Sequence, residues 1–141
     1  MKPMFKIWCK NKKEWETDLV AMLPDGGLIH FDKTSKFITL KPWTHIVIFW
    51  TGFKDVNGIK AFDKDLIEYD MFYIGDNKKE GGIGIIKWCE GEWIVEKQDG
   101  NFICGIWDVM TNYGGTIIGS SYERKDWRKE VATAYKNPTK S

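Results

Sequence analysis

The sequence lacks an excess of charge of either sign. Its 21 Lys and Arg residues face 20 Asp and Glu residues, which gives a formal net charge of +1 at pH 7. Because a strong overall field is the usual mark of a nucleic-acid or membrane partner, the total charge indicates neither. With 141 residues, the chain has the size of one domain or of two small subdomains.

Long hydrophobic runs are also missing. The longest, such as residues 46–50, hold five apolar residues, whereas a membrane helix needs about 20. The first ten residues, MKPMFKIWCK, contain no apolar core of the kind that secretory signals have. These absences predict a cytoplasmic protein with no membrane partner.

Cysteines are few and show no pairing pattern. Cys9, Cys89 and Cys104 are an odd number, and none forms a C-x-x-C pair. Such a set does not suit a disulfide framework and fits a reduced, intracellular protein. A nucleophilic cysteine needs a base and a cationic setting, and Cys9, followed by three lysines in four residues, comes nearest. Plain packing is the default interpretation for all three.

Aromatic residues, by contrast, are plentiful. They make up 15% of the chain, with eight tryptophans among them, and apolar residues reach 43%, which is ample for a core. Short β-branched and aromatic segments recur about every ten residues with turns between them, which predicts an all-β barrel or sandwich. The predicted strands are residues 5–9, 27–31, 37–40, 45–51, 66–69, 82–88, 92–96 and 101–106.

Three connections carry turn signals, and one segment has helical spacing. Residues 89–92 (CEGE) and 98–101 (QDGN) predict two hairpins, the second with a primed turn, and Asn57-Gly58 predicts a tight turn. Segment 45–51 is apolar on both parities, which predicts burial on both faces. A single apolar stripe predicts a C-terminal helix over 125–135, which Pro138 ends.

No motif for a cofactor or a metal stands out. His30 and His45 lie in separate predicted strands, so neither has a local partner ligand. The glycines of residues 80–84 and 113–116 fit no phosphate-binding pattern and open no helix. The acids of residues 63–70 would place Asp63 and Asp65 on one side of a strand, where they could hold a divalent cation, but a solvated strand entrance explains them better. We therefore expect no enzyme, no metal and no cofactor.

Charge is distributed unevenly along the chain. Residues 1–13 hold five lysines and no acid, residues 55–70 have a net charge of −3, and residues 124–141 have a net charge of +4. Lysines beside aromatic rings are the composition that single-strand nucleic-acid binders use. The alternative is a core strand followed by a solvated turn. The candidate nucleic-acid or partner surface comprises Trp8, Lys10, Lys12, Lys13, Trp15, Arg128 and Lys129.

Four blocks, in the same order, resemble the YopX family. Residues 5–15 (FKIWCKNKKEW) are similar to its opening F-R-A-W-D-K-x-x-K-x-M, and residues 51–67 (TGFKDVNGIKAFDKDLI) to its T-G-L-K-D-K-N-G-K-E-I-Y-E-G-D-I-V. Residues 84–88 (GIIKW) resemble the family's following G-x-V-x-W/Y strand, and residues 117–123 (IIGSSYE) resemble its closing V-I-G-N-I-Y-E. The chain differs at Lys64, where the family has the glycine of a tight turn, at Ser120, where it has asparagine, and in a tail from Arg124 onward.

The resemblance implies a single YopX-like domain over residues 1–141, with subdomains of about 1–50 and 51–123 and an extension over 124–141. It implies an all-β fold, with a decorated SH3-like barrel, a second small β subdomain and one short C-terminal helix. It also implies a bacteriophage or prophage source, and it supplies no catalytic residue or cofactor.

Together these observations predict a non-enzymatic phage or prophage accessory protein in the cytoplasm of its bacterial host. Its expected ligand is a host or phage protein, which the near-zero net charge favours over nucleic acid. One alternative is a single-stranded nucleic-acid-binding β module, and another is a homo-oligomeric structural protein that uses exposed aromatics as its interface.

Overall fold

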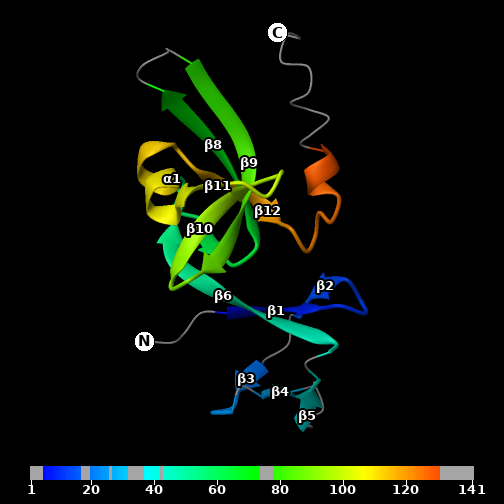
Figure 1. The fold of residues 1–141 in the computed structure, drawn as a ribbon. Coiled ribbons are helices and arrows are strands. Elements are labelled where there is room, and N and C mark those ends of the chain that lie inside the picture. The colour runs from blue at the N-terminus through cyan, green and yellow to red at the C-terminus, as the bar shows by residue number, and fades with distance from the viewer. Residues whose placement is uncertain are drawn as a thin grey trace. The chain divides into compact units, whose positions relative to one another are not determined.

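The structure is a computed structural model that describes residues 5–16, 20–25, 27–31, 37–41, 43–73 and 78–130. Nearly all regular elements in these ranges are antiparallel strands (Figure 1), so the predicted all-β fold is confirmed. The chain divides into two compact units, Met1–Phe49 and Trp50–Ser141, with the division inside strand β6 (His45–Lys54).

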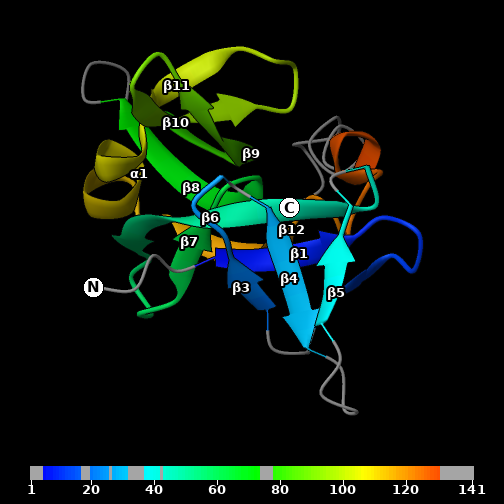
Figure 2. The same ribbon diagram turned by 90° about the horizontal axis from the view of Figure 1, so that it is seen from below.

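The first unit contains two small antiparallel sheets. In one, β1 (Phe5–Cys9) pairs with β2 (Glu14–Trp15) and with the first half of β6. In the other, β3 (Val20–Met22), β4 (Leu28–Phe31) and β5 (Phe37–Leu40) lie side by side in chain order (Figure 2). The buried residues between them include Ile7, Leu28 and Leu40.

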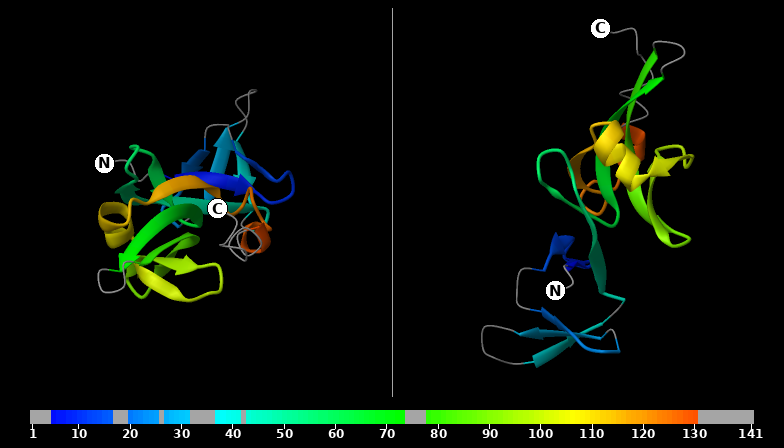
Figure 3. Two further views of the ribbon diagram at one scale, coloured as in Figure 1. Left: turned by 90° about the horizontal axis from the view of Figure 1, so that it is seen from above. Right: turned by 90° about the vertical axis from the view of Figure 1, so that its left-hand side faces the viewer.

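The second unit is built on a five-stranded sheet in the order β11-β10-β9-β8-β12. These strands are β8 (Asp65–Tyr73), β9 (Lys78–Cys89), β10 (Glu92–Lys97), β11 (Phe102–Gly105) and β12 (Thr116–Ser120). The second half of β6 pairs with β7 (Lys60–Phe62), and helix α1 (Ile106–Asn112) packs against β10 and β11 (Figure 3).

Two apolar clusters fill the second unit. The larger joins sheet residues such as Ile67, Ile86 and Val95 to Val109 and Met110 of α1. The smaller contains Leu66, Ile85 and Trp127, so part of the C-terminal extension completes the core. Residues 127–130 are helical, and the rest of the predicted 125–135 helix lies outside the described residues.

Each predicted strand coincides with an observed one. The sequence did not predict helix α1 or the short strands β2, β3, β7 and β12. The α1 segment carries β-branched Ile106 and Val109 and has no side-chain cap at its N-terminus, so it lacks the usual helix signals. The prediction that 45–51 is buried on both faces is wrong at Phe49, whose side chain is 44% exposed.

The predicted turns are present, with one corrected in type. Glu90 and Gly91 both have positive φ, as a primed two-residue turn requires. In the next hairpin only Gly100 has positive φ, and its N–H donates to the Lys97 carbonyl at 3.0 Å. The primed turn predicted there is therefore wrong, because a three-residue loop ending in a left-handed glycine closes this hairpin.

Candidate functional site

The residues of the most specific motif, 51–67, hold the second unit together. Asp55 is buried, and its Oδ1 accepts hydrogen bonds from the N–H groups of Asn57 and Ile59 at 2.9 and 2.8 Å. Its Oδ2 accepts from the N–H of Ile117, at 2.8 Å, on β12. The carboxylate thus closes the Asn57-Gly58 turn and ties it to a strand that is remote in sequence.

Other polar side chains of the motif have the same structural use. The Thr51 hydroxyl donates to the Ala61 carbonyl at 2.7 Å and accepts from the Phe53 N–H at 3.1 Å. Asp65 is buried and accepts from the Phe62 N–H at 2.9 Å. Lys64 has a φ of 66°, so this lysine adopts the left-handed conformation that the family's glycine would supply. A lysine therefore makes the tight turn here, at a left-handed position that glycine favours.

The glycines of residues 80–84 allow close strand packing and form no phosphate cradle. A Cβ placed on Gly82 would lie 2.8 Å from the Tyr69 hydroxyl, and one on Gly84 would lie 2.7 Å from both the Glu96 carbonyl and Val95. A side chain at residue 84 would displace the backbone of β10, whereas one at residue 82 would displace the Tyr69 ring.

The carboxylates of 63–70 do not converge as the paired-carboxylate hypothesis required. Asp63 lies in the turn before β8 and not on the strand, so it does not share a strand face with Asp65. Burial raises the pKa of Asp63 above its ordinary value, although Lys64 and Lys87 act to lower it. Its Oδ1 atom is buried without a hydrogen-bond partner. Within the described ranges, no group of three or more potential ligands could hold a metal ion.

The cysteines and the described histidine offer no activated nucleophile. Cys9 is buried, Cys89 is exposed, and all three cysteines are free thiols. Burial, with a smaller contribution from the charge of Asp108, raises the pKa of Cys104, which disfavours the thiolate. The imidazole of His45 contacts the Thr44 hydroxyl at 2.7 Å through Nδ1 and lies 3.8 Å from Glu16 through Nε2. The side chain of His30 lies outside the described part of the structure.

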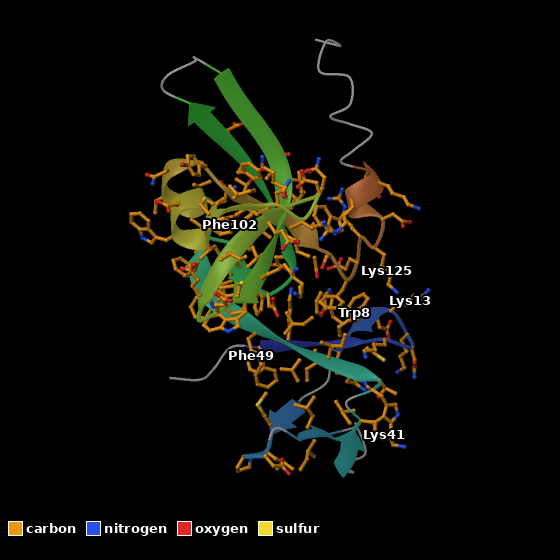
Figure 4. All side chains as sticks on the ribbon, in the orientation of Figure 1. Trp8, Lys13, Lys41, Phe49, Phe102 and Lys125 are labelled. Carbon is orange, nitrogen blue, oxygen red and sulfur yellow. The ribbon has the colours of Figure 1, made fainter. Side chains whose placement is uncertain are left out.

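The predicted basic–aromatic surface is only partly formed. Trp8 is 4% exposed and packs edge-on against Trp15, with ring centroids 4.8 Å apart. The Lys6 ammonium lies 4.1 Å from the centre of the Trp15 ring. The prediction that Trp8 belongs to an exposed partner surface is therefore wrong, and the alternative of a core strand followed by a solvated turn describes β1. Lys10, Lys12 and Lys13 are exposed in the turn after β1, as predicted. Figure 4 labels Lys13 in this turn.

The fold brings a different tryptophan to these lysines. The Lys10 N–H donates to the Thr44 carbonyl at 2.8 Å, which joins the β1–β2 turn to the loop before β6. In that loop Trp43 is 66% exposed, and the Lys41 ammonium lies 5.4 Å from its ring centre. We call Lys10, Lys12, Lys13, Lys41 and Trp43 the lysine–Trp43 patch. The sequence pattern Lys41-Pro-Trp43 before a strand is the signal that could have revealed it.

The predicted C-terminal cations, Arg128 and Lys129, belong to the second unit. The Arg128 side chain makes several contacts within that unit. Its guanidinium donates to the carbonyl of Gln98 at 2.5 Å, lies 3.6 Å from Glu96, and stacks on Trp127 at 4.7 Å. These contacts fasten the C-terminal segment to the β10–β11 hairpin. Lys129 is exposed on the helical turn that follows.

A second aromatic surface lies on the sheet face that carries α1. Ile86 packs in the α1 cluster, so Trp88, two residues further along β9, projects from the same face. Trp88 is 57% exposed and meets Trp93 of β10 edge-on, with centroids 5.0 Å apart. On α1 itself Trp107 is 60% exposed. We call Trp88, Trp93 and Trp107 the tryptophan face.

Acidic groups border the tryptophan face. Glu90 is exposed in the turn after β9, and Asp108 follows Trp107 in the first turn of α1. The exposed Glu92 is the first residue of β10. The exposed Phe102 adds a further ring at the start of β11 (Figure 4). In the described residues there is no helix both long enough and apolar enough to span a membrane.

Comparisons with known proteins concern the family and the fold. The model of the family described as "YopX protein" matches residues 4–126. A solved structure, that of protein EF1440 from Enterococcus faecalis, is similar with a TM-score of 0.61 and 17% sequence identity, covering 91% of this chain and 99% of that chain. No curated protein matches the chain. The structural similarity concerns the fold alone.

Proposed function

This chain belongs to the YopX protein family, and we propose that it is a non-enzymatic accessory protein of a bacteriophage or prophage that binds a host or phage protein in the bacterial cytoplasm. The proposal retains the SH3-like barrel expected from the family resemblance, because a small barrel offers sheet edges and short loops to a partner.

The tryptophan face carries the proposal. Trp88 is largely exposed, yet its ring is held against Trp93, so binding would cost little side-chain entropy. Exposed, pre-ordered tryptophans are the residues that most often dominate the affinity of protein interfaces. Trp107, on the helix that packs against β10 and β11, is a second exposed ring of this unit.

The charge around this face selects the kind of partner. Glu90 and Asp108 would repel phosphate groups, which disfavours nucleic acid at this position. They would attract lysine and arginine side chains at the rim of an apolar contact. We therefore propose a protein partner with a basic, apolar surface.

The use of polar side chains in the second unit agrees with a binding role. The polar side chains of the motif that could take part in catalysis instead form hydrogen bonds with backbone groups of the fold. They are Thr51, Asp55 and Asp65. Their arrangement stabilises a scaffold and leaves the aromatic rings as the exposed feature.

The test compares the full chain with two variants in a pull-down from bacterial lysate. Trp88→Ala combined with Trp107→Ala removes both anchors, and Trp43→Ala removes an equally exposed ring from the first unit. We expect a protein that the wild type and Trp43→Ala retain and the double variant loses. After identification by mass spectrometry, the purified partner should bind the double variant about 30-fold or more weakly in calorimetry.

Two outcomes would contradict the proposal. If no retained protein depends on Trp88 and Trp107, the tryptophan face is not the binding surface. If light scattering shows a dimer of the wild type that the double variant dissolves, the face joins copies of this chain and the homo-oligomer alternative replaces the protein-partner proposal.

A further inference from the structure

We infer that the lysine–Trp43 patch of the first unit binds single-stranded nucleic acid. This inference goes beyond the proposed protein partner, because it concerns other residues on the other unit. It rests on three observations about the patch: its lysines are exposed, its ring is exposed, and hydrogen bonding joins its two loops.

The cations of the patch are free to meet phosphates. Lys10, Lys12 and Lys13 are exposed, and in the described part of the chain no carboxylate forms an ion pair with them. Glu14 is the exposed acid next to them, whereas Glu16 lies beside His45. The patch therefore has more positive than negative charge, although the whole chain is nearly neutral.

The ring of the patch is open to a base. Trp43 is 66% exposed, whereas Trp8, a member of the candidate surface predicted from the sequence, is 4% exposed. The Lys41 ammonium lies 5.4 Å from the centre of the Trp43 ring, so a cation stands beside the stacking surface. Single-strand binders pair such a ring with cations that follow the sugar–phosphate backbone.

The two loops of the patch are held together. The Lys10 N–H donates to the Thr44 carbonyl at 2.8 Å, and Cys9 is the strand partner of His45. These contacts place the three-lysine turn directly beside the loop that carries Trp43. Figure 4 shows Lys13 and Lys41 at the same end of the first unit.

A single strand fits the patch better than a duplex. The patch has one exposed ring and short turns, and it presents no helix or long strand to a groove. An exposed ring can stack only on a base whose face is open, which a single strand offers and a paired duplex does not.

The experiment measures fluorescence anisotropy of a labelled 12-nucleotide oligothymidylate with the full chain at several salt concentrations. We expect binding at about 20 mM salt that weakens as salt rises, with a log–log slope of about −2 to −3 for the three or four phosphates that these lysines can reach. A duplex of equal length should bind at least tenfold more weakly.

The variants separate the ring from the charges. Trp43→Ala should weaken binding about tenfold and Trp43→Phe should retain most of it, because phenylalanine preserves a stacking ring. Lys12→Glu with Lys13→Glu should abolish binding. The control Lys54→Glu with Lys125→Glu makes the same charge change at exposed lysines of the second unit, and it should bind nearly as the wild type does.

The inference is overturned by any of three results. These are no binding at low salt, equal binding of Trp43→Ala and wild type, or equal losses in the two lysine double variants. Trp88→Ala with Trp107→Ala should leave oligothymidylate binding intact. Failure here therefore leaves the protein-partner proposal standing, and failure of that proposal leaves this inference standing.

Discussion

The two units expose tryptophans in opposite electrostatic surroundings. The first unit, residues 1–49, holds 8 Lys and Arg residues against 5 Asp and Glu residues, and its exposed Trp43 stands beside lysines. The second unit, residues 50–141, holds 13 against 15, and acids flank its exposed Trp88 and Trp107. An exposed ring by itself does not identify a ligand, whereas the charges around it distinguish a phosphate backbone from a basic protein.

The units also differ in how they use buried polar groups. In the second unit, the carboxylate of Asp55 accepts three backbone hydrogen bonds. One of them comes from Ile117, which is 62 residues away in the sequence. In the described part of the first unit, the best-placed polar pair is the imidazole of His45 beside the Thr44 hydroxyl. The second unit therefore has an internal polar clamp, and we expect its stability to depend on that clamp.

Asp55→Ala should show the largest effect. Without the carboxylate, the N–H groups of Asn57, Ile59 and Ile117 lose their acceptor, and the loss should cost about 3–5 kcal/mol of unfolding free energy. Urea denaturation followed by tryptophan fluorescence measures it. Asn57→Ala, which leaves the carboxylate in place, is the control and should cost about 1 kcal/mol. Equal costs for the two variants would show that the clamp is not the source of stability.

Truncation of one core residue in each unit tests whether the two cores are separate. Ile86 belongs to the α1 cluster and Ile7 to the cluster of Leu28 and Leu40, and the two clusters share no described residue. Ile86→Ala should cost about 3 kcal/mol and raise amide hydrogen exchange in β8–β10. Ile7→Ala should raise exchange in β1 and β4 and leave β9 protected. Equal exchange changes in both units for either variant would contradict separate cores.

Asp63→Asn should produce the smallest effect, with a definite sign. Burial raises the folded-state pKa of Asp63, so the folded state binds the proton more tightly than the unfolded state. The charged carboxylate therefore lowers the unfolding free energy at pH values above that pKa. As pH falls, protonation of Asp63 restores this free energy. Asp63→Asn should raise the unfolding free energy at pH 7 by up to about 1 kcal/mol, and the gain should vanish in acid.

Asp99→Asn is the matched control of opposite sign. The backbone N–H of Asn101 lowers the pKa of Asp99, so its charge favours the folded state above the unfolded-state pKa, and this contribution is lost in acid. Thermal melts from pH 3 to pH 7 should show the two variants diverging as pH rises. If the melting temperatures of the two variants followed the same dependence on pH, the folded state would not shift the two pKa values in opposite directions as described.

Much of the fold followed from local patterns. Short β-branched and aromatic segments located each predicted strand, and the glycines of residues 58 and 91 identified tight turns, because these signals act between near neighbours. Helix α1 was missed because its sequence favours strands, and packing of Val109 and Met110 against the sheet overrides that preference. The spacing of Ile106, Val109 and Met110 was the signal available.

The sequence predicted which residue types form the candidate surface, lysines beside aromatic rings, but not which individual residues form it. Exposed lysines after the first strand were foreseen, whereas the choice among tryptophans was not. Trp8 and Trp43 have similar local sequences, each near lysines, but one is buried and the other exposed. Arg128 looked like a surface cation and instead donates to the Gln98 carbonyl.

The sequence by itself determined the family, the all-β class and the positions of the predicted turns, since these depend on residue types at fixed short spacings. Only the tertiary structure decided which rings face solvent and which charges stand beside them. The reason is that burial and ion pairing depend on strand register and on contacts between distant segments, such as Lys10 with Thr44 or Asp55 with Ile117. The distinction between a phosphate-binding ring and a protein-binding ring lies in those contacts.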